Sequence, residues 1–333
     1  MKRFAVRFAV FLLPLWMVLA VYLRYDPFEV VYPRDRYYSD PRIAYNRESQ
    51  STNIFLANHG KVGYDSFIFG SSRSLAFLCR DWEQYLDSRG TYHFDASGET
   101  LLGIYRKVRF LENRGVVFRN GLLVLDAETL EKTNAGKGIV FIPHPKVSGG
   151  SYLDYHLTFL RVFVVPKFFI GYLDYKANGH VRPRFRDTFD MRDFQHDPIT
   201  NDLFFISDEK EIREGPERYY TRRKGTFYKR EGGKTAPSPP VIGETQRRSL
   251  QEIQKALSRS GGEGAVVISP LYDQKLLNRQ DLVVLEEIFG KENVHDFSGV
   301  NRYTRDEHNY YEASHYRHAV ARRIMREIYM PVR

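Results

Sequence analysis

Hydrophobic and polar positions follow two different periods in the first and last thirds of the chain. Short uncharged runs, typical of strands buried on both faces, alternate with stretches in which apolar residues recur every three or four positions, as in amphipathic helices. The predicted strands are Ser66–Phe69, Tyr92–Phe94, Gly121–Leu125, Ala265–Ser269 and Val294–Phe297. The predicted helices are Leu75–Leu86, Thr100–Arg114, Thr245–Ser258, Asp281–Phe289 and Tyr316–Tyr329.

Strand alternating with helix predicts an α/β fold, in which a doubly wound parallel five-stranded sheet has helices on both faces. A small sheet of this kind has the flavodoxin-like order 2-1-3-4-5 and binds its ligand at the carboxyl ends of the strands. The domain spans residues 65–333, and residues 140–244 interrupt the pattern as a large insertion. Residues 25–64 have no clear period and predict a linker that packs on the domain.

The insertion begins with an apolar and aromatic stretch, Tyr152–Tyr175. Arg161, Pro166 and Lys167 interrupt it, so we expect a surface element broken at Pro166 and not a membrane span. A helix that covers the sheet and a helix that faces a membrane or a partner are both open interpretations. The insertion ends in Gly232–Pro240, whose glycines and prolines predict a flexible loop.

The run Phe8–Leu23 carries no charge. As a helix it is about 24 Å long, short of a hydrocarbon core, but arginines at both ends are able to snorkel to the interface. Basic residues precede it and favour a cytoplasmic N-terminus: Lys2, Arg3 and Arg7. We interpret residues 1–24 as a cytoplasmic tip and a single-pass signal anchor in the bacterial inner membrane, with a cleaved signal peptide as the alternative. Both interpretations place the domain outside the cytoplasm. A buried core helix fits less well, because the run starts near Met1 and is not amphipathic.

Composition narrows the class of protein. The 333 residues are 42% hydrophobic, which excludes a disordered chain, and the mean hydropathy of −0.47 excludes a polytopic membrane protein. The single cysteine, Cys79, excludes a disulfide scaffold. A net charge of +9 calls for an acidic partner. Outside the cytoplasm, anionic lipid or acidic polysaccharide fits this charge better than nucleic acid.

Candidate chemistry lies at two strand ends. Gly70-Ser71-Ser72-Arg73 follows the first strand, and Glu312 and His315 lie in the last loop before the C-terminal helix. Both motifs are expected at one edge of the sheet, where a hydroxyl, an imidazole and a carboxylate supply a nucleophile, a base and an orienting acid. Alone, Gly-Ser-Ser is far more typical of an ordinary turn, and Glu312 with His315 also fits a capped helix start.

Several further residues are expected near that edge. Asp306 is the alternative acid, and Ser71, Asp126, Tyr272 and Asn309 are possible pocket residues. Nearby Asp296, Asn301 and Thr304 complete a polar cluster, in which loop hydrogen bonding is the preferred interpretation for Asn301 and Thr304. The spacing of His308, Glu312 and His315 does not match a zinc motif. We therefore expect no metal and no cofactor.

The pairing of Gly-Ser-Ser-Arg with a late acid-x-x-His resembles the SGNH (GDSL-like) hydrolase superfamily. It is most similar to the membrane-anchored bacterial branch, which includes polysaccharide and teichoic-acid modification proteins. The resemblance covers residues 65–126 and 264–328. It implies that Ser72 is the nucleophile, His315 the base and Gly98 an oxyanion N–H donor, with Glu312 in place of the usual Asp.

Two positions depart from the family pattern. Asp126 stands where the family has Asn, and a carboxylate there would oppose an oxyanion, so the hole would rest on the N–H groups of Ser72 and Gly98. Arg73 replaces the usual residue after the serine, and would bind a substrate carboxylate or phosphate or pair with a neighbouring acid.

The resemblance implies an O-acyltransferase or esterase that acts on a cell-surface or exported glycan through acyl-Ser72. A multi-span acyl-exporting membrane protein is an expected partner, with Tyr152–Tyr175 as its docking element. The alternative is a non-catalytic glycan-binding or scaffold protein on a degenerate SGNH fold.

Overall fold

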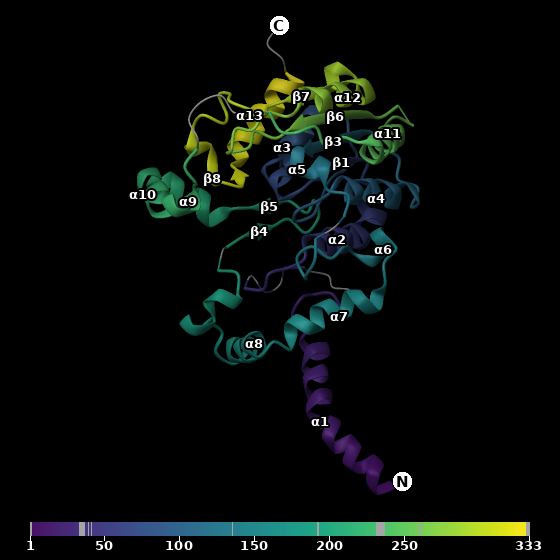
Figure 1. Ribbon diagram of the computed structural model, residues 1–333, viewed down its shortest axis with the longest axis vertical. Helices are drawn as coiled ribbons and strands as arrows, with labels where there is room; N and C mark the ends of the chain where they lie inside the picture. Colours follow the sequence, from purple (N-terminus) through teal and green to yellow (C-terminus); the bar gives the residue numbers. More distant parts are fainter. Residues whose placement is uncertain are drawn as a thin grey trace.

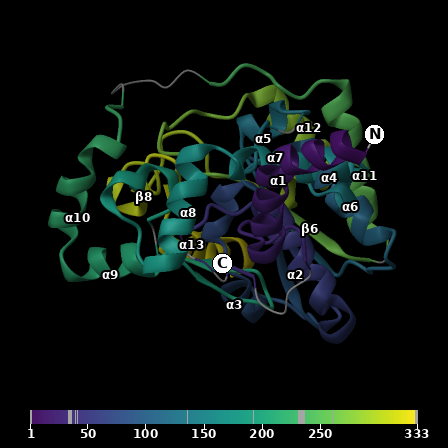
Figure 2. The same ribbon diagram turned by 90° about the horizontal axis from the view of Figure 1, so that it is seen from below.

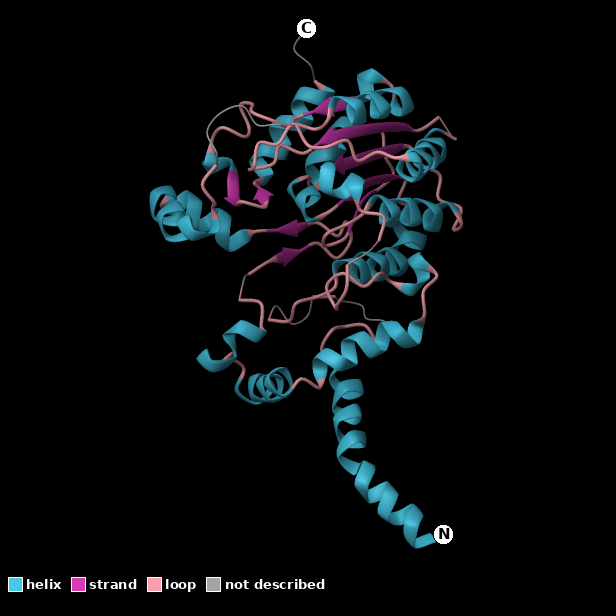
Figure 3. Ribbon diagram, viewed as in Figure 1, coloured by secondary structure: helices cyan, strands magenta, loops and turns pink. Residues whose placement is uncertain are grey.

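A parallel five-stranded sheet forms the centre of the protein (Figures 1 and 3). The computed structural model describes residues 2–32, 37–38, 40, 42–134, 136–191, 193–230, 237–259 and 261–330. The strands are β1 (Ser66–Gly70), β2 (Thr91–Asp95), β3 (Asn120–Leu125), β6 (Glu263–Ile268) and β7 (Val294–Asp296). Their order, β2-β1-β3-β6-β7, confirms the predicted sheet.

Alternating side chains of the strands pack into two cores, one on each face. Phe67, Phe69 and Leu123 join one core, whereas Ile68 and Leu122 join the other. The first core is covered by α2 (Arg47–Val62), α4 (Leu101–Glu112), α11 (Glu244–Ser258) and α12 (Arg279–Phe289). The second is covered by α13 (His318–Tyr329) and α3 (Cys79–Trp82). Helices therefore cover both faces of the sheet, as the uncharged strands predict.

One predicted helix is wrong, and one helix lies in a segment for which no helix was predicted. The predicted helix Leu75–Leu86 is broken into η1 (Ser72–Ala76), α3 and η2 (Glu83–Tyr85), because Phe77 and Leu78 turn extended and bury their side chains in the core. Conversely, the segment expected to be a linker contains α2. The first turns of α2 bury Arg47 and the five polar residues that follow it. Because these buried residues are polar, the sequence of α2 lacks the apolar period that would predict a buried helix.

The insertion folds into a series of short helices and strands. They are α6 (Pro145–Ser148), α7 (Tyr152–Phe163), α8 (Pro166–Asn178), η3 (Pro183–Thr188), β4 (Gln195–His196), β5 (Leu203–Phe204), α9 (Ile206–Glu214), α10 (Pro216–Arg223) and η4 (Lys224–Thr226). The turn between β4 and β5 covers the edge strand β2: His93 N–H donates to the Thr200 carbonyl (2.9 Å), and the Asn201 amide donates to the His93 carbonyl (2.6 Å). Covering this strand removes an exposed sheet edge.

The end of the insertion was predicted to be a flexible loop. Residues 232–236 of that loop lie outside the described residues. The remainder is held in place, because Pro237 forms a bridge with Leu276 and Ser238 N–H donates to the Leu276 carbonyl (2.8 Å).

Helix α1 (Lys2–Tyr25) projects from the end of the molecule at which α7 and α8 lie (Figure 1). Within the residues that the structure describes, no single helix is both long enough and apolar enough to cross a membrane. The apolar part of α1 covers Phe11–Tyr25. The pair α7 and α8 meets the criterion jointly, with a 76° bend at the break before Pro166, where the sequence predicted an interruption.

Candidate active site

The candidate nucleophile lies in a tight turn at the carboxyl end of β1. Ser71 caps η1, with its Oγ accepting from Arg73 N–H (3.4 Å), and Ser72 is the first residue of that turn. Gly70 is required here, because a Cβ atom would lie 2.7 Å from the Val124 carbonyl oxygen and 2.8 Å from Ser74 Cβ. The close approach of β3 thus fixes where the Ser72 hydroxyl emerges.

His315 and Glu312 reach the same edge from a short hairpin formed by β8 (Tyr310–Glu312) and β9 (His315–Tyr316), in which the two residues pair across the turn. His315 Nε2 lies 2.9 Å from Ser72 Oγ, and His315 Nδ1 contacts Glu312 Oε1. A carboxylate only accepts, so Nδ1 carries the proton and Nε2 is free to accept from the Ser72 hydroxyl. The hydrogen bonds run from Ser72 to His315 to Glu312, the arrangement of a nucleophile, a base and an orienting acid.

Glu312 is held in its ionised form. Burial raises the pKa of Glu312, but the hydrogen bonds from His315 and Ser314 outweigh burial, and the pKa lies below the usual value for glutamate. Ser314 N–H donates to Glu312 Oε2 (2.6 Å), which orients the second carboxylate oxygen. A negative charge beside Nδ1 stabilises an imidazolium when His315 takes a proton.

The Asp126 carboxylate forms an ion pair with Arg73. Its Oδ2 accepts from Arg73 (2.8 Å), and its Oδ1 accepts from Thr129 N–H (2.9 Å) at the start of α5 (Ala127–Glu131). Arg73 also binds Glu128 (2.9 Å), so the Arg73 side chain pairs with neighbouring acids, the second of the two alternatives weighed for it. The ion pair offsets the charge of Asp126, but its carboxylate side chain offers no N–H donor.

Gly98 lies in the loop after β2 with φ +57, a left-handed conformation that glycine adopts without strain. The next residue anchors the loop: Glu99 accepts from Thr100 N–H (2.8 Å) and pairs with the buried Lys107. Lys107 also pairs with Glu48 of α2 at 2.9 Å. The loop that carries Gly98 is therefore fixed by a buried ion cluster.

A cavity of about 360 Å³ opens beside the Ser72 hydroxyl. Ser72, Gly98 and His315 line one end of it. Most other wall residues come from residues 25–64 and from the insertion: Tyr38, Ile43, Tyr45, Arg47, Phe141, Asp190, Phe194, His196, Leu203 and Phe205. Six of these ten carry an aromatic ring. Burial lowers the pKa of His196 to about 4, with Arg47 adding to the effect, so this imidazole is neutral near pH 7. The volume is in the range of small-molecule sites.

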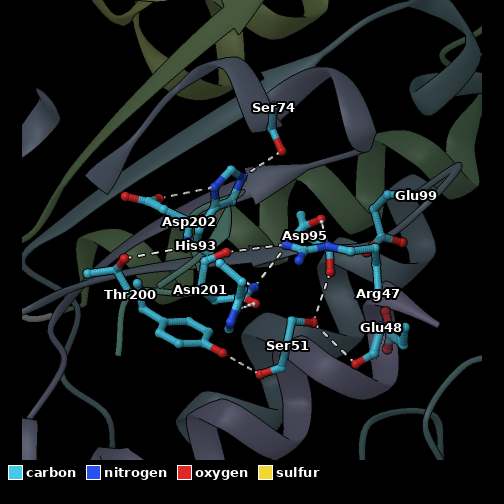
Figure 4. A network of polar contacts seen from close by, with 12 residues as sticks. Arg47, Glu48, Ser51, Ser74, His93, Asp95, Glu99, Thr200, Asn201 and Asp202 are labelled. Carbon is cyan, nitrogen blue, oxygen red and sulfur yellow. Dashed lines mark hydrogen bonds and ion pairs between the residues drawn. The ribbon is translucent and has the colours of Figure 1, made fainter. Parts of the chain in front are cut away.

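A buried polar network fixes one wall of this cavity to the sheet (Figure 4). Arg47 Nε donates to Asp95 Oδ2 (2.9 Å), and the Asn201 amide donates to Asp95 Oδ1 (3.1 Å). Asn201 also contacts His196 Nε2 (3.2 Å), which lines the cavity. The insertion wall is thereby connected to the end of β2, near Gly98.

The same view shows a second Ser–His–Asp group, formed by Ser74, His93 and Asp202 (Figure 4). Ser74 Oγ lies 2.9 Å from His93 Nε2 and donates to the Ser71 carbonyl (2.7 Å), while His93 Nδ1 is 3.6 Å from Asp202. All three side chains are at most 1% exposed, so no substrate reaches them. Their effect is to hold the turn that presents Ser72.

The four predicted pocket residues and the alternative acid Asp306 do not line the cavity. Tyr272 is buried in the second core, Asp306 caps η6 (Glu307–Asn309) and contacts His308 Nδ1 (3.0 Å), and Asn309 donates to the Tyr303 carbonyl (2.8 Å). Ser71 and Asp126 likewise serve the turn and α5 rather than the cavity. Within the described residues, no three His, Cys, Asp or Glu side chains gather as metal ligands.

Sequence reasoning missed the wall residues altogether. Arg47 and Tyr38 lie in the segment that was expected to be a linker. His196 lies in the β4–β5 hairpin and Phe194 and Phe205 flank it, and its strands of two residues are too short to show a period. The one usable signal was the turn composition of Asp197-Pro198 and Asn201-Asp202, typical of a tight connection.

No protein-family model, no curated protein and no solved structure matches this chain.

Proposed function

We propose that this chain is a serine O-acyltransferase or esterase on an SGNH-like fold, anchored by its N-terminal helix and acting outside the cytoplasm on a cell-surface or exported glycan. The observation that carries the proposal is the chain of hydrogen bonds from Ser72 through His315 to Glu312, opening on a cavity. The aromatic walls suit an acyl group and the faces of sugar rings.

The reaction proceeds in two displacements. Ser72 Oγ attacks the acyl carbonyl carbon while His315 Nε2 takes the hydroxyl proton, and His315 returns this proton to the leaving oxygen or sulfur as its bond to the acyl carbon breaks. His315 then takes a proton from a glycan hydroxyl or from water, whose oxygen attacks the acyl-Ser72 ester and releases the serine. The N–H groups of Ser72 and Gly98 stabilise the oxyanion, and the missing third donor costs roughly 10²–10³-fold in rate.

The matched pair Ser72→Ala and Ser71→Ala tests this proposal. We expect Ser72→Ala to lower hydrolysis of 4-nitrophenyl acetate by at least about 10³-fold with nearly unchanged melting temperature, because it removes the nucleophile and little packing. Ser71→Ala removes a cap and costs about 1 kcal/mol of stability, but should keep the rate constant kcat. Loss of activity in Ser71→Ala alone would move the nucleophile to Ser71, and equal activity in all three proteins would refute the proposal.

A non-catalytic glycan-binding or scaffold role is the second candidate. Asp126 favours it, since its carboxylate is committed to Arg73 and to α5 and supplies no oxyanion donor. Glycan binding that survives in Ser72→Ala, together with a wild-type protein that hydrolyses no ester, would support this role.

A further inference from the structure

The corner between α7 and α8 exposes apolar side chains on the side that faces away from the protein. Leu153 is 68% exposed and Ile170 is 54% exposed, and the exposed connection itself is Val164-Val165. We call this surface the α7–α8 corner: Tyr152, Leu153, Val164, Val165, Ile170 and Leu173. Burying these residues against an apolar environment is favourable, and nothing in the described chain covers them.

The opposite side of the corner is fixed to the body. Tyr155 and Ser49 share a hydrogen bond of 2.6 Å, Lys176 pairs with Asp40 at 2.8 Å, and Phe159 and Phe163 are fully buried in an aromatic cluster. Since both helices are attached along one side, they lie across the end of the molecule and do not extend from it as a spanning hairpin. Only one face is left for an external contact.

Helix α1 packs beside the corner, against aromatic residues on the attached side of α7 and α8. The Tyr22 ring lies 5.2 Å from the Phe163 ring, and the Tyr25 ring lies 6.2 Å from the Tyr172 ring. Asp26, which is 1% exposed, accepts from Val30 N–H (2.9 Å) and thereby fixes the turn after α1. Figures 1 and 2 show α1 leaving the body beside α7 and α8. Among the described side chains of α1, the exposed large aliphatic, Phe and Trp side chains are Phe4, Phe11, Leu13, Leu15, Trp16, Met17 and Leu23.

The charges around the corner are mainly basic. Residues 152–187 contain six Lys and Arg but only three Asp and no Glu. All six basic residues are exposed: Arg161, Lys167, Lys176, Arg182, Arg184 and Arg186. Four of them pair with acids, Lys167 with Asp187, Lys176 with Asp40, and Arg182 and Arg184 with Asp174. Apolar side chains bordered by tyrosines and long basic side chains are typical of a segment that lies in the interface of an anionic bilayer.

We propose that the α7–α8 corner is a second membrane contact, which inserts its apolar side chains among the lipids of an anionic bilayer next to α1. The position of α1 beside the corner favours lipid over a protein partner, because one flat surface then contacts both elements. Two contacts fix the orientation of the domain, which a single helix would leave free to rotate. This proposal rests on the proposed anchoring by α1 but not on the catalytic role of Ser72.

Depth-dependent fluorescence of the full-length chain tests the proposal. In a Cys79→Ser background, Val165→Cys and Leu153→Cys are labelled with an environment-sensitive NBD dye and mixed with vesicles of equal phosphatidylcholine and phosphatidylglycerol. We expect a shift of emission to shorter wavelength and quenching by doxyl-labelled lipids at both positions. Arg248→Cys is the matched control: Arg248 is 74% exposed on α11, away from the corner, and its label should show neither effect (Figure 1).

The opposite results are equally clear. Vesicle-bound protein whose corner labels emit as in water and are quenched by aqueous iodide would overturn the proposal, as would a failure to bind vesicles. Labels that are shielded only in native membranes would assign the corner to a protein partner instead. Val165→Glu with Ile170→Glu should remove the doxyl quenching of a Leu153→Cys label and leave the far-ultraviolet circular dichroism unchanged.

Discussion

At the scale of single residues, the site depends on which atoms carry protons. Glu312 accepts at both oxygens, so His315 is fixed in the tautomer that receives the Ser72 proton. The motifs at Ser72 and His315 could be predicted because each lies next to a strand end, where topology decides position. That Asp126 is one of the acids that pair with Arg73 could not be predicted, since this choice depends on how two loops approach each other. The catalytic roles themselves stay predictions.

Glu312→Gln should reduce kcat by roughly 10²–10⁴-fold, because an amide holds the imidazole tautomer less well and does not stabilise the imidazolium. His315→Ala should reduce kcat further, because it removes the group that moves the proton. Steady-state ester hydrolysis by both variants, with melting temperatures as the folding control, measures the difference. Wild-type activity in Glu312→Gln would assign the acid role to Asp306 or to no residue.

Glu48→Gln should weaken the pH dependence of stability. Burial raises the pKa of Glu48 to about 7 from 4.5 in the unfolded chain, with Lys107 lowering it and Glu99 raising it. Between these values the native state binds more protons than the unfolded state, so the free energy of unfolding falls as pH rises. Urea unfolding at pH 5 and pH 8 should therefore show a larger loss for the wild type than for Glu48→Gln. Equal losses would mean that Glu48 titrates normally.

At the scale of elements, the strands and most helices of the sheet domain followed from hydrophobic periods, but the elements that build the cavity did not. The first half of helix α2 is polar and buried, because Arg47 pairs with Asp95 and Glu48 pairs with Lys107. Local sequence contains no trace of such long-range partners. The hairpin of β4 and β5 is likewise stabilised by its contacts with β2 and not by its own period.

Asn201 connects the β4–β5 hairpin to the sheet, so replacing Asn201 should destabilise the protein. Asn201→Ala leaves the buried His93 carbonyl without its side-chain donor and places alanine at φ +64, so we expect a loss of about 2–3 kcal/mol in urea unfolding. Asn201→Gly is the matched control: it removes the same hydrogen bonds but accepts the backbone angle, and should lose about 1 kcal/mol less. Both variants should raise KM more than they lower kcat, because they loosen a cavity wall. Unchanged stability would exclude this connection.

At the scale of the whole molecule, the strand order was predictable because right-handed crossovers leave few arrangements for five parallel strands. The insertion was recognisable as an interruption, but not as a wall of the site, since its contacts join residues more than a hundred positions apart. The position of α1 beside α7 and α8 was beyond sequence reasoning for the same reason.

Topology decides which substrates reach the site. With Lys2, Arg3 and Arg7 in the cytoplasm, the domain is expected on the outer side of the membrane. Cys79 is fully buried, so Arg248→Cys in a Cys79→Ser chain provides a single exposed thiol. We expect it to react with a membrane-impermeant maleimide in intact spheroplasts. Reaction only after lysis would place the domain in the cytoplasm and exclude an extracellular glycan as substrate.

The central claim is that Ser72 is an activated nucleophile, and covalent labelling tests it most directly. The full-length protein is treated with a fluorophosphonate, and the adduct is located by mass spectrometry of its peptides, with Ser72→Ala and His315→Ala as controls. We predict one adduct per chain, on Ser72, absent in Ser72→Ala and formed far more slowly in His315→Ala because the base is missing. A wild-type protein that forms no adduct, or forms it at the same rate without His315, would contradict the account.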